Sequence, residues 1–160
     1  RMGEHYAAAV ARDSRVEYLL PGVVAVAERL RNEGFALGVL TGNSRAVARA
    51  KPEAAGVAHP FPIGAYGDTA HERGHLVEAG QREAWEHYRA TFDGPRTILV
   101  GDTPRDIEAA RAAGARVLAV ATGRFGVDDL AAHAPDAVLP DLSDVEAATA
   151  AIHAMVGVTR

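Results

Sequence analysis

Two carboxylates, Asp102 and Asp106, carry the clearest chemical signal in this sequence of 160 residues. They follow an apolar run of strand length at residues 98–100, and a single glycine separates that run from Asp102. Open α/β sheets bind their ligands at the carboxyl ends of the strands. Two carboxylates this close together offer the hard oxygen ligands that suit Mg²⁺. The alternative is that Asp102 only ends the strand and that Asp106 only favours the start of a helix, which a Thr-Pro pair would begin.

A second polar turn, Thr41-Gly42-Asn43, follows another apolar run of strand length at residues 35–40. If both runs belong to one parallel sheet, both turns lie at the same edge of that sheet. A hydroxyl group and two backbone N–H groups at a helix start suit a phosphate, although ordinary turn and capping residues would give the same pattern. A phosphate beside a divalent cation indicates phosphoryl chemistry.

Lys51 is the only lysine in a chain that otherwise uses arginine, and it follows the turn at Thr41. An ammonium group near a phosphate would neutralise charge on the transferring group. The alternative is a solvated lysine on the surface, which is the commonest environment of this residue type. The composition favours the functional interpretation only slightly.

Alternating strands and helices must position these residues. The spacing of apolar residues predicts helices at 23–32, 45–53, 69–88, 107–114, 127–133 and 142–155, and strands at 35–40, 98–100, 116–120 and 137–139, with a short strand within 59–63 and a turn-rich loop at 64–68. The helix at 69–88 would bury Leu76, Val77, Ala84, Trp85 and Tyr88. Strands that alternate with helices form βαβ units with right-handed crossovers. The predicted fold is therefore an α/β, three-layer, doubly wound parallel sheet.

Composition narrows the class of protein. The formal net charge is −4 and 48% of the residues are apolar, which indicates an ordinary globular domain and gives no basic patch for nucleic acid. No run approaches the roughly 18 apolar residues of a membrane span, and no signal peptide is recognisable. Cysteine is absent, which excludes disulfides and thiol chemistry. We expect a cytoplasmic protein with no nucleic-acid or membrane partner, and the sequence indicates no oligomeric state.

With these motifs in place, the sequence resembles the haloacid dehalogenase-like hydrolases over residues 15–155. The second motif of that family is matched by Leu40-Thr41-Gly42-Asn43, the third by Lys51, and the fourth, Gly-Asp-x-x-x-Asp, by residues 101–106. The segments at 21–23, 64–68, 113–115 and 120–123 are similar to the phosphoglycolate phosphatase-like branch.

The resemblance implies a Mg²⁺-dependent hydrolase of a small phosphorylated metabolite that works through an aspartyl-phosphate. The implied phosphate-binding residues are Thr41, Gly42, Asn43 and Lys51, of which Thr41 and Lys51 would also be catalytic. Asp102 would bind Mg²⁺ directly, and Asp106 would bind it directly or through water. The pair of carboxylates favours a phosphatase over a true dehalogenase.

The first motif of the family, an Asp-x-Asp that supplies the nucleophile and the acid/base, is missing. We expect residues 1–20 to be part of a small helical cap or a linker, and residues 21–160 to be the core without its first strand. In this family that strand lies between the strands that end at Leu40 and Val100. Another segment could fill its place, the two strands could pair directly, or the chain could be part of a longer protein.

We therefore expect residues 1–160 alone to show no phosphatase turnover. An alternative is a non-catalytic relative that keeps the phosphate and metal edge as a binding or regulatory module. A dinucleotide-binding domain is disfavoured, because no Gly-x-Gly-x-x-Gly follows any predicted strand.

Overall fold

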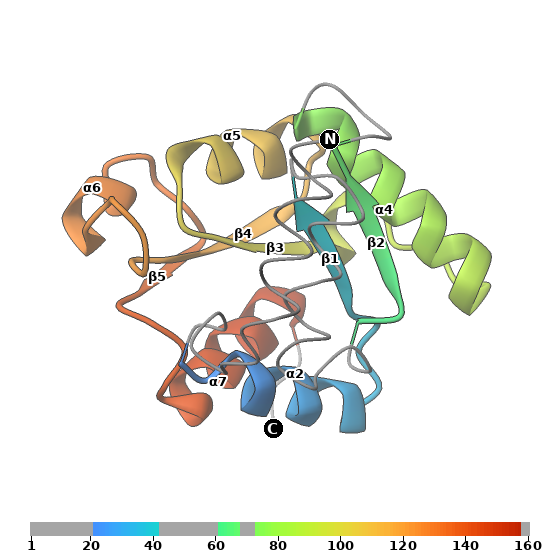
Figure 1. Cartoon of the computed structure of the whole chain (residues 1–160), viewed down its shortest axis with the longest axis horizontal. Coiled ribbons are helices and arrows are strands. Elements are labelled where there is room, and N and C mark those ends of the chain that lie inside the picture. The colour runs from blue at the N-terminus through green and yellow to red at the C-terminus, as the bar shows by residue number, and fades with distance from the viewer. Residues whose placement is uncertain (1–20, 42–60, 68–72, 158–160) are drawn as a thin grey trace, which may run out of the picture.

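A computed structural model of the chain describes residues 21–41, 61–67 and 73–157 (Figure 1). The described helices are α2 (Val23–Asn32), α4 (Arg73–Tyr88), the 3-10 helix η2 (Gly94–Arg96), α5 (Pro104–Ala112), α6 (Val127–Ala131) and α7 (Val145–Val156). The described strands are β1 (Gly38–Thr41), β2 (Ile63–Tyr66), β3 (Ile98–Gly101), β4 (Arg116–Val120) and β5 (Ala137–Leu139). None of these helices has both the length and the apolar content needed to cross a bilayer.

The strands form two parallel sheets, one of β1 and β2 and one in the order β3-β4-β5. Helices α4 and α5 cover one face and α2 and α7 cover the other, which makes three layers (Figure 1). The three-layer, doubly wound α/β fold expected from the sequence is confirmed.

Strand β4 packs against helices on both of its faces. Val117 and Ala119 pack into the cluster that contains Ile107 of α5, while Leu118 and Val120 pack into the cluster formed with α2 and α7. These four residues are buried, because both faces of a central parallel strand lie under helices. This explains why β4 reads in the sequence as a continuous apolar run.

Side-chain pairs between charged groups and the close approach of Gly22 to the backbone of Leu142 hold the layer of α2 and α7 together. The Glu33 carboxylate pairs with the His153 ring at 2.5 Å and with Arg29 at 3.3 Å, and Arg29 also pairs with Glu146 of α7. Gly22, which caps α2, has φ of 83°, and a Cβ there would lie 1.7 Å from the carbonyl oxygen of Leu142. The glycine is therefore required by both its backbone conformation and its neighbour.

The edges of the two sheets, β1 and β3, face each other (Figure 1). Within the described residues no hydrogen-bonded ladder joins them, and they belong to separate sheets. Of the arrangements considered from the sequence, direct pairing of these two strands is therefore not the one that forms.

Strand β2 corrects one prediction. Residues 64–66 were expected to lie in a turn-rich loop, yet they form most of a fully buried strand. A Cβ on Gly64 would lie 2.4 Å from the hydroxyl oxygen of Tyr66, so the tyrosine ring occupies the space that a side chain at position 64 would need. The glycine serves packing on the strand and not a turn.

The predicted inner face of α4 is partly wrong. Leu76, Val77 and Ala84 are buried as expected, but Trp85 is 49% exposed and Tyr88 is also exposed. The C-terminal end of α4 projects beyond the strands that the rest of the helix covers (Figure 1). Trp85 instead lies under the guanidinium of Arg89, 5.5 Å from its ring centroid.

Strand β1 begins three residues later than predicted, because residues 35–37 lead out of the preceding helix. The N–H of Phe35 donates to the carbonyl of Leu30, which closes the C-terminal end of α2. The predicted helix at 45–53 and the expected cap remnant at 1–20 lie outside the described residues.

Candidate active site

Asp106 lies at the start of α5, in the cap of that helix. Its Oδ2 accepts hydrogen bonds from the backbone N–H of Thr103 at 3.0 Å and from the Thr103 hydroxyl at 2.8 Å. The Asp106 N–H in turn donates to the Thr103 hydroxyl, so the two residues form a capping box at the start of α5, where Pro104 is the first helical residue. The Asp106 residue is only 7% exposed. The helix-start role that the sequence allowed is thus present, and it engages one of the two carboxylate oxygens.

Asp102 is in a different environment. It follows the last residue of β3, is partly exposed, and makes no hydrogen bond or ion pair with any residue that the structure describes. Its carboxylate lies against Gly123, where an added Cβ would come 2.5 Å from Oδ2. The loop after β4 therefore approaches Asp102 so closely that only glycine leaves the carboxylate in this position.

The hydroxyl of Thr122 adds a further oxygen near this edge. Its Oγ1 is buried and has no hydrogen-bond partner in the described part of the chain. Buried hydroxyl groups are normally paired, so an unpaired one next to the loop that touches Asp102 fits a bound water or ion. The carboxylates of Asp102 and Asp106 and this hydroxyl offer only oxygen atoms, the type of ligand that suits Mg²⁺ better than a transition metal. No cluster of three or more His, Cys, Asp or Glu side chains occurs among the described residues.

The ends of β1 and β3 both line a cavity of about 500 Å³. Leu40 and Asp102 both line it, and Asp102 is its only carboxylate among the described lining residues. Thr41, the last residue of β1, follows Leu40 directly and is partly buried. The other residues expected to hold a phosphate, Gly42, Asn43 and Lys51, lie outside the described residues.

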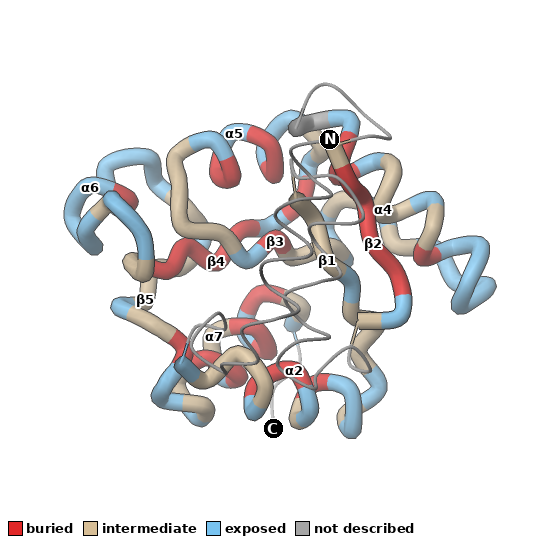
Figure 2. Tube along the Cα trace, in the orientation of Figure 1, coloured by how far each residue is buried: buried red, intermediate tan, exposed pale blue. Residues whose placement is uncertain are grey.

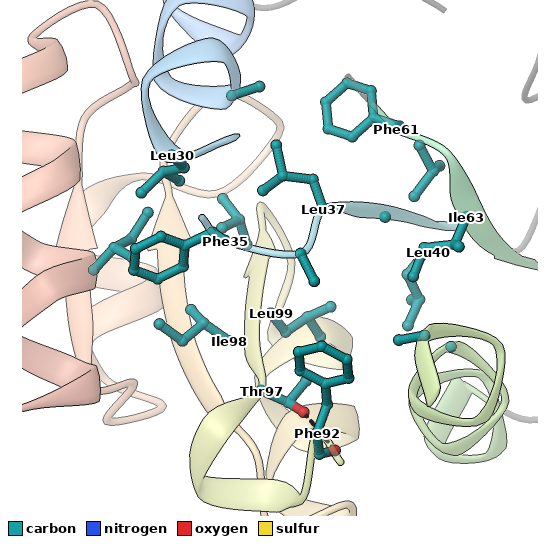
Figure 3. A pocket seen from close by; sticks show the side chains of 18 of the residues that line it. Leu30, Phe35, Leu37, Leu40, Phe61, Ile63, Phe92, Thr97, Ile98 and Leu99 are labelled. Carbon is teal, nitrogen blue, oxygen red and sulfur yellow. Dashed lines mark hydrogen bonds between the residues drawn. The ribbon is translucent and has the colours of Figure 1, made fainter. Parts of the chain in front are cut away.

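The cavity is mostly apolar. Leu37 and Leu40 project into it from the side of β1, and Ile98 and Leu99 from the side of β3 (Figure 3). Thr97, one of its few polar lining residues, is already bonded, because its hydroxyl lies 2.9 Å from the Gln81 amide nitrogen and also reaches the carbonyls of Phe92 and Asp93.

Comparisons with known proteins bear on the family and the fold of the chain. A family model described as HAD-hydrolase-like matches residues 73–145. The phosphoglycolate phosphatase of Synechococcus elongatus is 33% identical over 129 residues, which are 79% of this chain and 57% of that protein. A Dickeya dadantii protein named "Probable phosphatase IndB" is 33% identical over 135 residues, with 84% and 57% covered. The chain belongs to the haloacid dehalogenase-like hydrolases. Its similarities lie in their phosphoglycolate phosphatase-like branch, as the motifs indicated.

Solved structures of haloacid dehalogenase-like proteins share the fold. A predicted phosphoglycolate phosphatase from Haemophilus somnus superposes with a TM-score of 0.66 at 22% identity, over 82% of this chain and 57% of the other. CbbY from Rhodobacter sphaeroides, solved in complex with phosphate, gives 0.66 at 20% identity, over 79% and 56%. The chain thus spans little more than half the length of these relatives.

Two residues of this candidate site were not singled out from the sequence as site residues. Thr122 and Gly123 were interpreted as a loop after a strand, and their segment was noted only for its family likeness. The available signal was the same one that marked Asp102, namely a position at the carboxyl end of a buried strand. The closeness of Gly123 to Asp102 depends on the pairing of β3 with β4, which aligns Gly101 with Ala119.

Proposed function

We propose that this chain is the larger part of a Mg²⁺-dependent phosphatase that hydrolyses a small phosphate monoester. The observation that carries the proposal is the partly exposed carboxylate of Asp102, which lies at a strand end, against Gly123, and has no partner among the described residues. An unpaired carboxylate at the ligand-binding edge of an α/β sheet is suited to hold a cation. The names of the two curated relatives, both phosphatases, support the reaction class.

In the proposed site Asp102 holds Mg²⁺ directly. Asp106, whose Oδ2 also accepts the hydrogen bonds of the helix cap, would hold it directly or through a water. When bound, Mg²⁺ neutralises the negative charge that develops on phosphoryl oxygens. Thr41 donates its hydroxyl to the phosphoryl group, and Lys51 offers an ammonium to the same oxygens. The backbone N–H groups of Gly42 and Asn43 complete this set of donors.

The carboxylate that attacks phosphorus is proposed to come from outside residues 1–160, since no Asp-x-Asp occurs in this sequence. An aspartyl-phosphate would form on that carboxylate as the alcohol leaves, and water would then release phosphate. The purified 160-residue chain is expected to release no phosphate from small monoesters. Phosphate release by this chain that Asp102→Ala abolishes would contradict the proposal.

Mg²⁺ binding is testable without turnover. We expect Mg²⁺ to raise the melting temperature of the chain, with an apparent affinity that falls at least about tenfold in Asp102→Asn. Asp128→Asn is the matched control, because Asp128 is an exposed carboxylate in the first turn of α6, away from the cavity. Equal Mg²⁺ responses of the two variants would overturn the assignment of Asp102.

The absence of an Asp-x-Asp from the sequence also favours a second candidate, a non-catalytic domain that binds a phosphorylated metabolite and Mg²⁺. Both candidates require Asp102. They separate when the complete protein is assayed, because only the enzyme releases phosphate.

A further inference from the structure

The solvent-facing side of α4 carries a row of residues that the proposed site does not use. Glu78, Arg82, Trp85 and Arg89 are all exposed, and we call them the outer row. In an α-helix, where successive residues turn by about 100°, these four positions fall within about 60° of one another. The buried apolar residues of α4 lie on the opposite side. Most of the C-terminal half of α4 is exposed, whereas the neighbouring strand β2 is buried throughout (Figure 2).

Trp85 and Arg89 form an exposed pair at the end of this row. Trp85 is the only tryptophan of the chain and is 49% exposed, and the Arg89 guanidinium lies 5.5 Å from the centroid of its ring. The Arg89 N–H donates to the carbonyl of Trp85, and Arg89 has a positive φ of 55°. Helices usually reach this left-handed conformation at a glycine, because a Cβ disfavours it. The arginine thus stays beside the tryptophan in spite of a strained backbone. Tryptophan and arginine are the residue types most enriched at the energetic centres of protein interfaces.

The charged groups of the outer row are available to another molecule. Glu78, Arg82 and Arg89 form no ion pair with any residue that the structure describes. The acidic group stands at the N-terminal end of the row, and the two basic groups stand further along it. Two copies of such a row are complementary when the helices run antiparallel, because the acidic end of one then lies beside the basic end of the other.

One register matches the whole row. A two-fold axis that crosses the helices midway between residues 83 and 84 places Glu78 level with Arg89 of the second copy, and Arg82 level with Trp85. Each contact then occurs twice. The Glu78 carboxylate meets a guanidinium, and the Trp85 ring gains a second guanidinium, from Arg82 of the other copy, as a cation–π partner.

We propose that the outer face of α4 is a docking surface for a second copy of this chain, through a two-fold, antiparallel pair of α4 helices. A contact along a single helix buries less than the roughly 1,000 Å² of a stable interface, so the dimer is weak and reversible. Its exposed ion pairs are screened by salt, so it weakens as the ionic strength rises. This surface is independent of the proposed function, because it uses no residue of the proposed site.

The first test is sedimentation equilibrium of the 160-residue chain, at concentrations up to about 1 mM because interfaces of this size are weak. We expect a monomer–dimer equilibrium. Glu78→Arg is expected to raise the dissociation constant at least about tenfold, because two attractive contacts per dimer become repulsive. The double variant Glu78→Arg with Arg89→Glu restores opposite charges and is expected to associate more tightly than either single variant. Glu28→Arg is the matched control, because Glu28 is an exposed glutamate of α2, in the other helix layer, and the change in net charge is the same.

The second test uses the absence of cysteine from the chain. Glu78→Cys and Arg89→Cys are prepared as separate proteins and oxidised alone or as an equal mixture. In the proposed register positions 78 and 89 of two copies are level with each other, whereas two copies of the same position lie about 16 Å apart along the helices. A disulfide requires Cα atoms within about 7 Å, so a covalent dimer is expected from the mixture and not from either protein alone.

Three results would overturn the inference. They are a chain that stays monomeric at the highest concentration, a dissociation constant that Glu78→Arg and Glu28→Arg change equally, and disulfide dimers that form as readily from one cysteine variant as from the mixture. A monomer would mean that the outer row is solvated or is covered by a segment from outside residues 1–160. Thermal unfolding of each variant checks that the substitutions, which are all at exposed positions, leave the fold intact.

Discussion

The substitution Thr103→Val tests whether the cap of α5 positions the second carboxylate of the proposed site. It removes the hydroxyl and keeps the shape of the side chain. Two hydrogen bonds are lost, one that the hydroxyl donates to Asp106 Oδ2 at 2.8 Å and one that it accepts from the Asp106 N–H at 3.3 Å. The backbone N–H of Thr103 still donates to the same oxygen. The variant therefore weakens the capping box without abolishing it.

The expected cost follows from these two contacts. Loss of a side-chain cap costs about 1 kcal/mol of unfolding free energy. A hydrogen bond to a charged group contributes about 1.5–3 kcal/mol. Because Asp106 is only 7% exposed, water cannot readily replace the lost donor. We expect Thr103→Val to lower the free energy of unfolding by about 3 kcal/mol, and the melting temperature by roughly 6–12 °C for a chain of this length.

The assay is urea unfolding followed by circular dichroism, with Thr149→Val as the matched control. Thr149 is also buried, but its hydroxyl donates to the carbonyl of Val145 inside α7, which the helix itself also engages. The control is expected to cost less than about 1 kcal/mol. If Thr103→Val costs no more than Thr149→Val, the capping box does not hold Asp106 and the proposed position of its carboxylate loses its support.

Two further predictions concern the loops at the sheet edge. Gly123→Ala would place a Cβ 2.5 Å from Asp102 Oδ2, so the apparent Mg²⁺ affinity in a thermal-shift titration is expected to fall about 10–100-fold. Gly126→Ala is the control and should leave the affinity unchanged, because its Cβ meets only ordinary contacts. Equal affinities of the two variants would contradict the contact between Gly123 and Asp102. The Ser143 hydroxyl, and after it the Ser143 backbone N–H, lowers the pKa of Asp141 below its ordinary value of 3.8, so this contribution to stability is present above pH 3.8 and is lost as the pH falls through the folded-state pKa. Ser143→Ala should therefore raise the Asp141 pKa in an NMR titration and reduce stability at neutral pH, with a difference from the wild type that disappears in strong acid; a difference that persists there would refute this origin.

Local signals in the sequence were sufficient for several elements. The bounds predicted for α2, β4 and β5 match the structure residue for residue. The start of α5 was also predicted, because Thr103 and Pro104 are the residue types that cap and begin a helix. These elements depend on apolar periodicity and capping, which act within a few residues of chain.

Errors occurred where packing overrides local preference. The glycine at position 64 reads as a turn, but the ring of Tyr66 makes it a strand residue. Trp85 reads as core, but α4 extends past the sheet before it reaches that residue. Neither result can be predicted from residues nearby in the sequence, because each depends on tertiary packing.

The sequence by itself determined the family, the order of strands and helices, and the two carboxylates that follow β3, since all of these are carried by residue types and short spacings. Only the tertiary structure decided that the Asp102 carboxylate lies against Gly123 and that Asp106 is engaged by its own helix cap. It also decided that β1 and β3 line a cavity of about 500 Å³. The reason is that burial, the pairing of strand edges and the packing of side chains across the layers are set by segments far apart in the chain.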